Sequence, residues 1–268
     1  MTKQKVMSFN LRIEAGIDGI NHLDNRKGNI LDVINREAPD LIGFQEVRDG
    51  TRAWLRDNLT DYMVVGCGRL EDYRGESTPI AFRKDKFELV SLETFWLSST
   101  PSIPASVYAG SDQSGCPRMA VAVVLKPLES KQLLLFVNTH TDHEGKMART
   151  LAAAQLLEYL SKKGLPCILT GDLNACPDST EIQMLSAAKD FPLCDATCTI
   201  RGSFHAFGRL WSDPQYIEAY GEHGMKIDYV FTNLAHDPSE SYAVEDPHTD
   251  GIFISDHQPV VAYLSLDA

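Results

Sequence analysis

The order of predicted helices and strands is typical of an α/β domain in which two β-sheets pack face to face with helices outside. Strands alternate with helices near both ends of the 268-residue chain, whereas a block of strands without helices fills the middle. A doubly wound parallel sheet fits this mixed order less well, because it places a helix between successive strands. No linker, low-complexity tract or short repeat interrupts the chain, and its length suits one domain over residues 1–268.

Period-two alternation predicts the first strand over 6–13, and helical spacing of apolar residues predicts a helix over 26–38 that Pro39 stops. The strand predicted over 41–47 places Glu46 on the same face as Ile42 and Phe44. A short helix follows over 51–59. Further strands are predicted over 62–67, 78–83, 87–97, 119–126 and 133–140, the last two as a hairpin.

The Ser-, Pro- and Gly-rich segment 98–117 predicts a long loop of the kind that often carries function. The helix over 147–163 ends at Gly164, before the strand over 167–173. Asp178 and Glu181 resemble a capping box that opens a helix through Leu185. Strands over 226–232 and 259–266 finish the chain.

The composition limits the classes of function. The net charge of −12 argues against a protein that wraps duplex nucleic acid, since such proteins display a basic face. No run of about 18 apolar residues is present to span a membrane. The N-terminus enters a strand directly without the apolar core of a signal peptide, which favours the cytoplasm unless a leader has been trimmed. The six cysteines lack a C-x-x-C spacing and are predicted to be free thiols in a reducing compartment, with a disulfide or a metal site at Cys194 and Cys198 as the alternatives.

Polar and ionisable residues occur where apolar strands end, and this is the main functional signal. Burying such groups is costly unless they are paired or hold a cation. The segments are Ser8-Phe9-Asn10, Gln45-Glu46, Asn138-Thr139-His140, Gly171-Asp172-Leu173-Asn174, Lys226-Ile227-Asp228-Tyr229 and Ser255-Asp256-His257. Each alone has an ordinary explanation, such as a turn cap for Asn10, a surface carboxylate for Glu46 or a structural histidine for His140. Asp228 lies in an apolar run and needs a partner, for which His257 is the natural candidate.

Together these residues match the needs of phosphate ester hydrolysis: a cation, donors for the phosphoryl group and a carboxylate that orients water. Glu46 offers hard oxygen ligands suited to Mg²⁺ or Mn²⁺, with Asn10 and Asp256 as companions. Asp172 is the candidate base, and Asn174 is a neutral donor on the same loop. Three further side chains are candidates for contacting phosphate oxygens: Arg118, His140 and His257.

These segments, in this order over 6–263, resemble the endonuclease/exonuclease/phosphatase superfamily of metal-dependent phosphoesterases. The resemblance implies a four-layer α/β/β/α sandwich with two mixed central sheets, outer helices and a site at one edge. It implies that Glu46 is the principal metal ligand, that Asp172 positions or activates water, and that Asn174 binds phosphate. It also implies that His257 faces the scissile phosphate, oriented by Asp228, with His140 close by.

Two positions refine the resemblance. The superfamily's DNA-repair members carry an acidic residue two positions after the first Asn, where this chain has Arg12. Arg12 removes one candidate metal ligand and favours the deadenylase, lipid-phosphodiesterase and phosphatase branches. The stretch Gly202-Ser203-Phe204-His205-Ala206-Phe207 resembles a bacterial subgroup, in which His205 would line the substrate pocket.

We therefore expect an Mg²⁺- or Mn²⁺-dependent hydrolase of phosphate esters or diesters. The acidic balance and Arg12 favour a small phosphorylated ligand, such as a sugar phosphate, nucleotide or lipid head group. The alternatives are a nuclease acting on single strands and a noncatalytic module that binds phosphorylated ligands. The sequence carries no signal for an oligomeric state.

Overall fold

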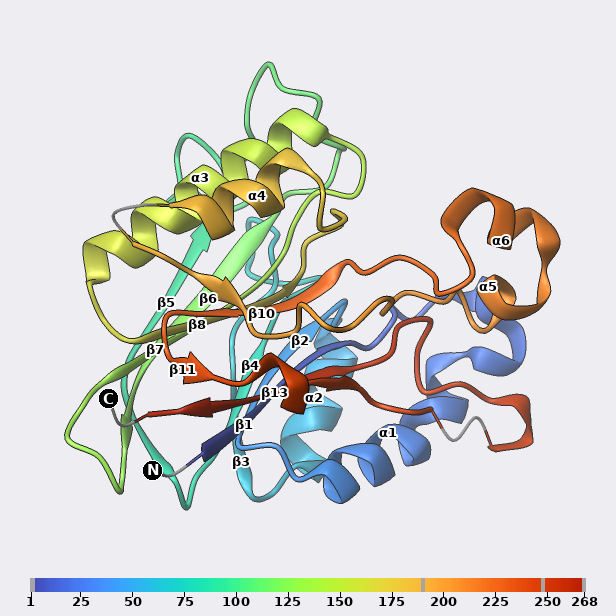
Figure 1. The fold of residues 1–268 in the computed structure, drawn as a ribbon, viewed down its shortest axis with the longest axis horizontal. Helices are drawn as coiled ribbons and strands as arrows, with labels where there is room; N and C mark the ends of the chain where they lie inside the picture. Colours follow the sequence, from blue (N-terminus) through green and yellow to red (C-terminus); the bar gives the residue numbers. More distant parts are fainter. Residues whose placement is uncertain (1–2, 189–190, 247–248, 267–268) are drawn as a thin grey trace.

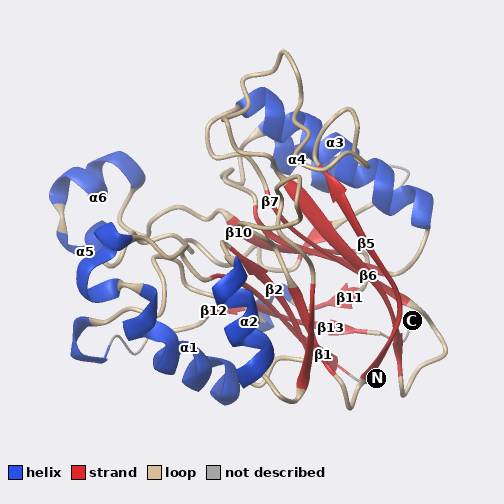
Figure 2. Ribbon diagram, turned by 180° about the vertical axis from the view of Figure 1, so that it is seen from behind, coloured by secondary structure: helices blue, strands red, loops and turns tan. Residues whose placement is uncertain are grey.

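Two mixed β-sheets lie face to face at the centre of the molecule, and helices cover their outer faces (Figures 1 and 2). This computed structural model describes residues 3–188, 191–246 and 249–266. The α/β/β/α sandwich expected from the sequence is confirmed, and both sheets combine parallel and antiparallel pairs.

The first sheet contains both ends of the described chain. Its strand order is β11-β13-β1-β2-β4-β3, with β12 also paired to β13. β1 and β2 are parallel, and β13 and β4 flank them in antiparallel fashion. The strands are β1 (Lys3–Asn10), β2 (Leu41–Gln45), β3 (Tyr62–Val65), β4 (Ile80–Arg83), β11 (Ala235–His236), β12 (Tyr242–Ala243) and β13 (Val260–Ser265).

The second sheet has the order β5-β6-β7-β8-β10-β9. The predicted hairpin is present as β6 and β7, and β7 runs parallel to β8. The strands are β5 (Phe87–Trp96), β6 (Met119–Pro127), β7 (Leu134–His140), β8 (Cys167–Asp172), β9 (Cys194–Asp195) and β10 (Asp228–Thr232).

Helices pack on the outside of each sheet. α1 (Leu23–Glu37) and α2 (Asp49–Asn58) cover the first sheet, and α3 (Lys146–Lys163) and α4 (Thr180–Ala187) cover the second. α5 (Arg209–Ser212) and α6 (Pro214–Tyr220) project beside η1 (Gly16–Asn21), and the remaining 3₁₀ turns are η2 (Pro238–Glu240) and η3 (Thr249–Gly251). One apolar cluster lies between the sheets and two lie under the outer helices, so the chain buries three apolar layers.

The predicted elements are present with ends shifted by a few residues, and the segment 98–117 is a loop. The prediction of a capping box at Asp178 and Glu181 was wrong. The residue before α4 is Ser179, which makes no side-chain cap bond, and Glu181 instead accepts a 2.7 Å hydrogen bond from Nε of Arg149 on α3. The acidic side chain thus joins two helices. All six cysteines are free, and no helix within the described ranges is long and apolar enough to cross a membrane.

The topology brings distant strand ends to one edge of the sandwich. In the first sheet β1 ends at Asn10 beside Gln45, where β2 ends. In the second sheet His140 and Asp172 are partners at the ends of parallel β7 and β8. β10 runs the opposite way, so its first residue, Asp228, is the partner of Asp172. Residues that the sequence predicts to be functional therefore lie together at this edge. They are Asn10, His140, Asp172 and Asp228.

Candidate active site

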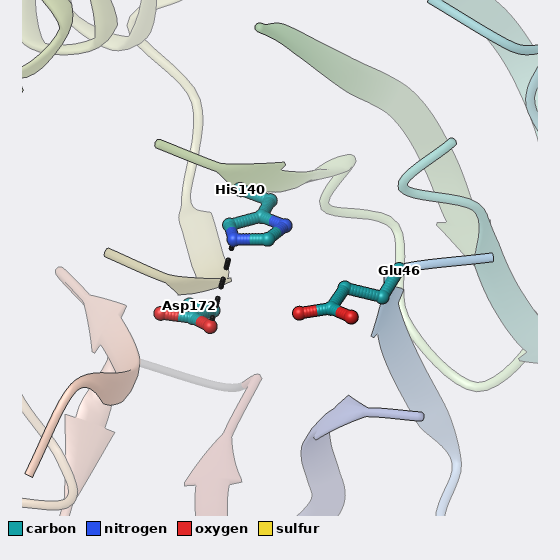
Figure 3. A group of neighbouring side chains, drawn as sticks. All are labelled: Glu46, His140 and Asp172. Carbon is teal, nitrogen blue, oxygen red and sulfur yellow. Dashed lines mark ion pairs between the residues drawn. The ribbon is translucent and has the colours of Figure 1, made fainter. Parts of the chain in front are cut away.

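Glu46, His140 and Asp172 form the centre of this edge (Figure 3). Each offers a ligand atom, and these atoms lie within 4.8 Å of one another. Nε2 of His140 is 3.6 Å from Oδ2 of Asp172, and both residues are buried. Glu46, from the first sheet, extends toward this pair from the second, so the two sheets contribute to one group.

Asn10 connects the carboxylates. Its Nδ2 donates to Oε1 of Glu46 at 3.1 Å and to Oδ2 of Asp172 at 2.9 Å. Its Oδ1 accepts from the backbone N–H of Arg12 at 2.8 Å. In this orientation Asn10 holds the two acids together through its nitrogen, and its oxygen would reach the same place only after the amide rotates.

His257 and Asp228 form the buried pair expected from the sequence. Nδ1 of His257 lies 2.8 Å from Oδ2 of Asp228, which leaves Nε2 directed at Asp172, 3.8 Å away. Burial lowers the pKa of His257, but the carboxylate of Asp228, aided by Asp172, outweighs burial and raises the pKa to about 10. The imidazole is therefore held as a cation with a fixed orientation.

Asn174 lies on the turn after β8. Its backbone N–H donates to Oδ1 of Asp172 at 3.0 Å, and its Nδ2 lies 3.0 Å from Nε2 of His140. Asp172 thus has one oxygen bound by Asn10 and the other by Asn174. Its carboxylate is fixed from both sheets.

Asp256 and Arg12 border the site beside Glu46. Burial and the Glu46 carboxylate raise the pKa of Asp256 to about 6, against the opposing effect of His257. Nε of Arg12 is 3.7 Å from Oδ2 of Asp256, while the same guanidinium forms a two-bond pair with Asp18 at 3.0 and 3.1 Å. Arg12 therefore places a cation between Asp18 and Asp256.

The backbone is strained at three points around these groups. Arg12, Glu46 and Asn174 have φ of 54°, 60° and 47°, in the left-handed region that non-glycine residues seldom adopt. Each such residue costs on the order of 1–3 kcal/mol, and such residues cluster at functional sites. Glu46 directly follows the end of β2, and Arg12 and Asn174 lie two residues after the ends of β1 and β8.

Arg26 is a supporting residue to which sequence reasoning gave no role. It is fully buried, and its guanidinium donates to four backbone carbonyls, those of Leu11, Arg12, Asn21 and Ile254, at 2.6 to 3.0 Å. It thereby ties the turn after Asn10 to the segment before Asp256. Burial lowers the pKa of Arg26 to about 10. The signal in the sequence is a single Arg in the otherwise apolar face of α1.

Arg118 lies one contact away from the centre. Its guanidinium is 2.8 Å from Nδ1 of His143 and within 3.8 Å of Glu76 and Asp142. Glu76, which sequence analysis missed because it lies in an irregular loop, is 3.5 Å from Nδ1 of His140. Burial raises the pKa of Glu76, but His140 and the neighbouring arginines overcome it and lower the pKa to about 2. Arg118 reaches the site through Glu76 rather than by touching Asp172.

His205 packs inside an aromatic cluster. Its ring stacks on Trp211 with centroids 4.6 Å apart and lies 5.4 Å from Phe253. Nδ1 of His205 accepts a hydrogen bond from the backbone N–H of Gly208. The backbone of His205 donates to the carbonyl of Asp256, so this segment supports the site through its main chain.

The sequence matches the endonuclease/exonuclease/phosphatase family over residues 7–257. The chain belongs to this family. The family's members are phosphoesterases that act by hydrolysis. No curated protein matched the chain.

Solved structures agree with this assignment. An endonuclease/exonuclease/phosphatase from Bacteroides vulgatus is 28% identical, with both chains fully covered and a TM-score of 0.84. A mannosyl-6-phosphatase from Bacteroides thetaiotaomicron is 27% identical over 98% of this chain and 100% of that one, with a TM-score of 0.80. The human Nocturnin catalytic domain, 19% identical over 98% of this chain and 94% of that one, shares the fold at a TM-score of 0.70.

Proposed function

We propose that this chain is an Mg²⁺- or Mn²⁺-dependent phosphoesterase that hydrolyses a small phosphorylated ligand, with a sugar phosphate as the favoured class. The observation that carries the proposal is the convergence of Glu46, His140, Asp172 and the Asp228–His257 pair at one edge of the sandwich. These groups come from strands far apart in the sequence.

The residues fit a divalent cation. Glu46, His140 and Asp172 offer ligand atoms within 4.8 Å of one another, and Asp256 is a further buried carboxylate that interacts with Glu46. The carboxylate oxygens of Glu46, Asp172 and Asp256 suit Mg²⁺ or Mn²⁺. Glu46 and Asp256 would hold the ion, with Asn10 joining after its amide rotates. A bound ion would neutralise the phosphate oxygens.

The chain's own residues have distinct roles in this proposal. Asp172, held by Asn10 and Asn174, accepts a proton from the attacking water. His257 is kept protonated and oriented by Asp228, and it donates to the phosphate from Nε2. His140 and Asn174 lie beside Asp172, where they can bind phosphate oxygens.

Two observations favour a small substrate. The net charge of −12 gives little attraction for a polyanion. The mannosyl-6-phosphatase shares more identity with this chain than does Nocturnin, and it matches over its full length. A single-strand nuclease is the second enzymatic candidate, and its hydrolysis of oligonucleotides would fall steeply with salt.

The test compares wild-type protein with Asp172→Asn on mannose 6-phosphate and on a nitrophenyl phosphodiester, with Mn²⁺ and with excess chelator. We expect turnover that chelator abolishes and that Asp172→Asn lowers by about 10²–10⁴-fold. Asp178→Asn is the matched control, since Asp178 is an exposed carboxylate on the same loop. Undiminished turnover by Asp172→Asn, with circular dichroism unchanged, would refute the role of Asp172. Turnover that persists in excess chelator would refute the requirement for a divalent cation.

A further inference from the structure

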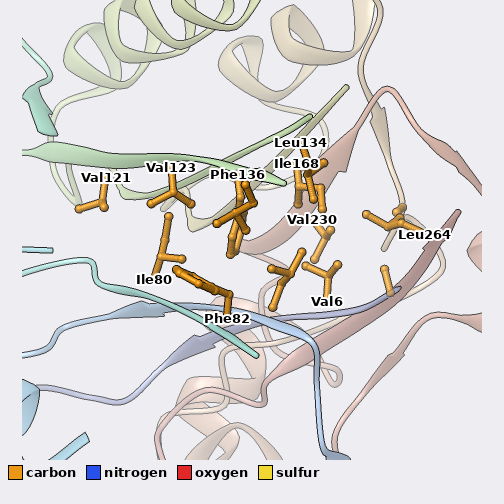
Figure 4. Close-up of a cluster of buried hydrophobic side chains, with 14 of the residues drawn as sticks. Val6, Ile80, Phe82, Val121, Val123, Leu134, Phe136, Ile168, Val230 and Leu264 are labelled. Atoms are coloured by element: carbon orange, nitrogen blue, oxygen red, sulfur yellow. The ribbon is translucent and has the colours of Figure 1, made fainter. Parts of the chain in front are cut away.

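The layer between the two sheets changes character toward the active site. In its middle it is apolar, with Phe136, Ile168 and Val6 in one cluster (Figure 4). Two residues further along each strand, the same face carries neutral polar side chains: Asn138, Thr170 and Ser8. Two residues further again it carries His140, Asp172 and Asn10. A neutral polar layer thus separates the core from the catalytic groups.

Asn138 is the centre of this layer. Although it belongs to β7 of the second sheet, its Nδ2 donates to carbonyls on the first-sheet side, at 2.7 Å to Phe44, 3.1 Å to Thr78 and 3.2 Å to Pro79. Its Oδ1 accepts from Nε2 of Gln45 at 2.7 Å, which also crosses between the sheets. Each of these bonds joins one sheet to the other.

Thr170 and Ser8 complete the connection. The Thr170 hydroxyl donates to Oδ1 of Asn138 at 3.0 Å, and Nε2 of Gln45 donates to the Ser8 hydroxyl at 3.2 Å. All four side chains are 0% exposed. We call this group, Ser8, Gln45, Asn138 and Thr170, the seam network.

Gly43 lets the sheets approach closely at this level. A Cβ placed on Gly43 would lie 2.1 Å from the Thr170 hydroxyl and 2.4 Å from Oδ1 of Asn138. No side chain larger than hydrogen fits there without displacing the network. The separation of the sheets is therefore set by hydrogen bonds at one level, directly beneath the site.

We propose that the seam network is a positioning device that fixes the two halves of the active site relative to each other. This inference rests on the proposed function, because it assigns a role in that chemistry. Asn10 and Glu46 come from the first sheet, and His140 and Asp172 come from the second. Each residue of the network precedes one of these by one or two positions along the chain. A shift at the seam therefore moves Glu46 relative to Asp172.

Thr170 bonds to Oδ1 of Asn138, which also accepts from Gln45 of the first sheet, so its hydroxyl acts on a side chain that bonds across the two sheets. A buried hydroxyl outside the network bonds to no such side chain. Thr232 is such a case, since its hydroxyl donates to the carbonyl of Cys167 on neighbouring β8, at 2.7 Å. Thr232 is as deeply buried as Thr170, but it lies at the end of β10 that is distant from Asp228. It offers a matched control.

The experiment compares Thr170→Val with Thr232→Val, and uses Thr170→Ser for rescue. Both valine variants lose one buried hydroxyl. Thr232→Val also removes the acceptor of the Leu234 backbone N–H, so its Tm should fall at least as far as that of Thr170→Val. Only Thr170→Val is expected to lower kcat, by about tenfold, with KM changed less than about twofold, because misplacement of catalytic groups by ~1 Å costs up to about 10²-fold. Mn²⁺ affinity measured by calorimetry should also fall in Thr170→Val alone, and Thr170→Ser should restore both.

Equal kcat and equal Mn²⁺ affinity in the two valine variants would overturn the proposal. A wild-type protein that neither turns over substrate nor binds Mn²⁺ would instead refute the proposed function. In that case, crystal structures of the wild type and of Thr170→Val test whether the seam network positions the two halves of the site. A displacement of Asp172 relative to Asn10 by more than about 0.5 Å in Thr170→Val supports it. Unchanged geometry overturns it.

Discussion

Replacing Arg26 by methionine should destabilise the protein and loosen the turn that follows Asn10. Methionine fills much of the volume of arginine but donates no hydrogen bond. The carbonyls of Leu11, Asn21 and Ile254 then lose their donor inside the protein. The carbonyl of half-buried Arg12 can accept a hydrogen bond from water instead.

The magnitude follows from two opposing contributions. Three buried carbonyls without donors cost about 2 kcal/mol each, or about 6 kcal/mol together. Burial lowers the pKa of Arg26 from its ordinary value to about 10, so removing the charge returns about 3 kcal/mol. The free energy of unfolding should therefore fall by about 3 kcal/mol. Lysine at this position keeps the positive charge but provides fewer hydrogen-bond donors than arginine. Arg26→Lys should therefore not restore stability.

Urea unfolding followed by circular dichroism measures this change, and calorimetry with Mn²⁺ measures its effect on the site. Arg36→Met is the control, because Arg36 lies on the same helix with its side chain 50% exposed. The control should change the unfolding free energy by less than about 0.5 kcal/mol. If Arg26→Met were as stable as Arg36→Met, the four carbonyl contacts would not hold the turn, and the reasoning would fail.

Two further perturbations test separate parts of the structure. The Asp142 carboxylate accepts from the backbone N–H of Ser114, Glu144 and Gly145. Although burial opposes them, these bonds and the Ser114 hydroxyl lower the pKa of Asp142 to about 2. Because the folded pKa lies below the unfolded value of about 3.9, Asp142 contributes up to about 2 kcal/mol above pH 4, which is lost as pH falls toward 2. The difference in unfolding free energy between wild type and Asp142→Asn should shrink over that range, and a constant difference would contradict this. Asp228→Asn should lower kcat by at least about a hundredfold with little change in KM, since it removes the partner that orients His257. Asp237→Asn, at an exposed cap, should leave kcat unchanged, and equal rates in the two variants would show that orientation by Asp228 is not needed.

Most of the fold could be predicted from the sequence, because the elements that build it are strongly periodic. The strands β6, β7 and β8 begin with runs of apolar residues, and α3 ends before a glycine with φ of 59°. The short elements could not be predicted. β9, β11 and β12 have two residues each and are held by pairing with neighbouring strands, which sequence periodicity does not report.

Among the site residues, too, some could be predicted from the sequence and others could not. Asp228 and His257 could be matched from the sequence because a buried acid needs a partner. Glu76 could not be found, since its loop has no periodicity and His140, the site residue that it approaches, is remote in sequence. His205 was expected to line the substrate pocket from a motif. Whether it does so remains a prediction, but its ring packs on Trp211 because the neighbouring aromatic residues enclose it.

Glu46 shows why strand alternation alone misplaces an active-site residue. A strand continuing through position 47 would direct Glu46 with Ile42 and Phe44 into the apolar layer under α1 and α2, and this expectation was wrong. The strand ends at Gln45, and the left-handed conformation of Glu46, with φ of 60°, turns its carboxylate toward Asn10 and the backbone N–H of Ile13. Those hydrogen bonds offset the strain of about 1–3 kcal/mol, and the turn also avoids the cost of burying a carboxylate among apolar side chains. The position of the acid is therefore decided by one backbone angle, which the pattern of residues does not encode.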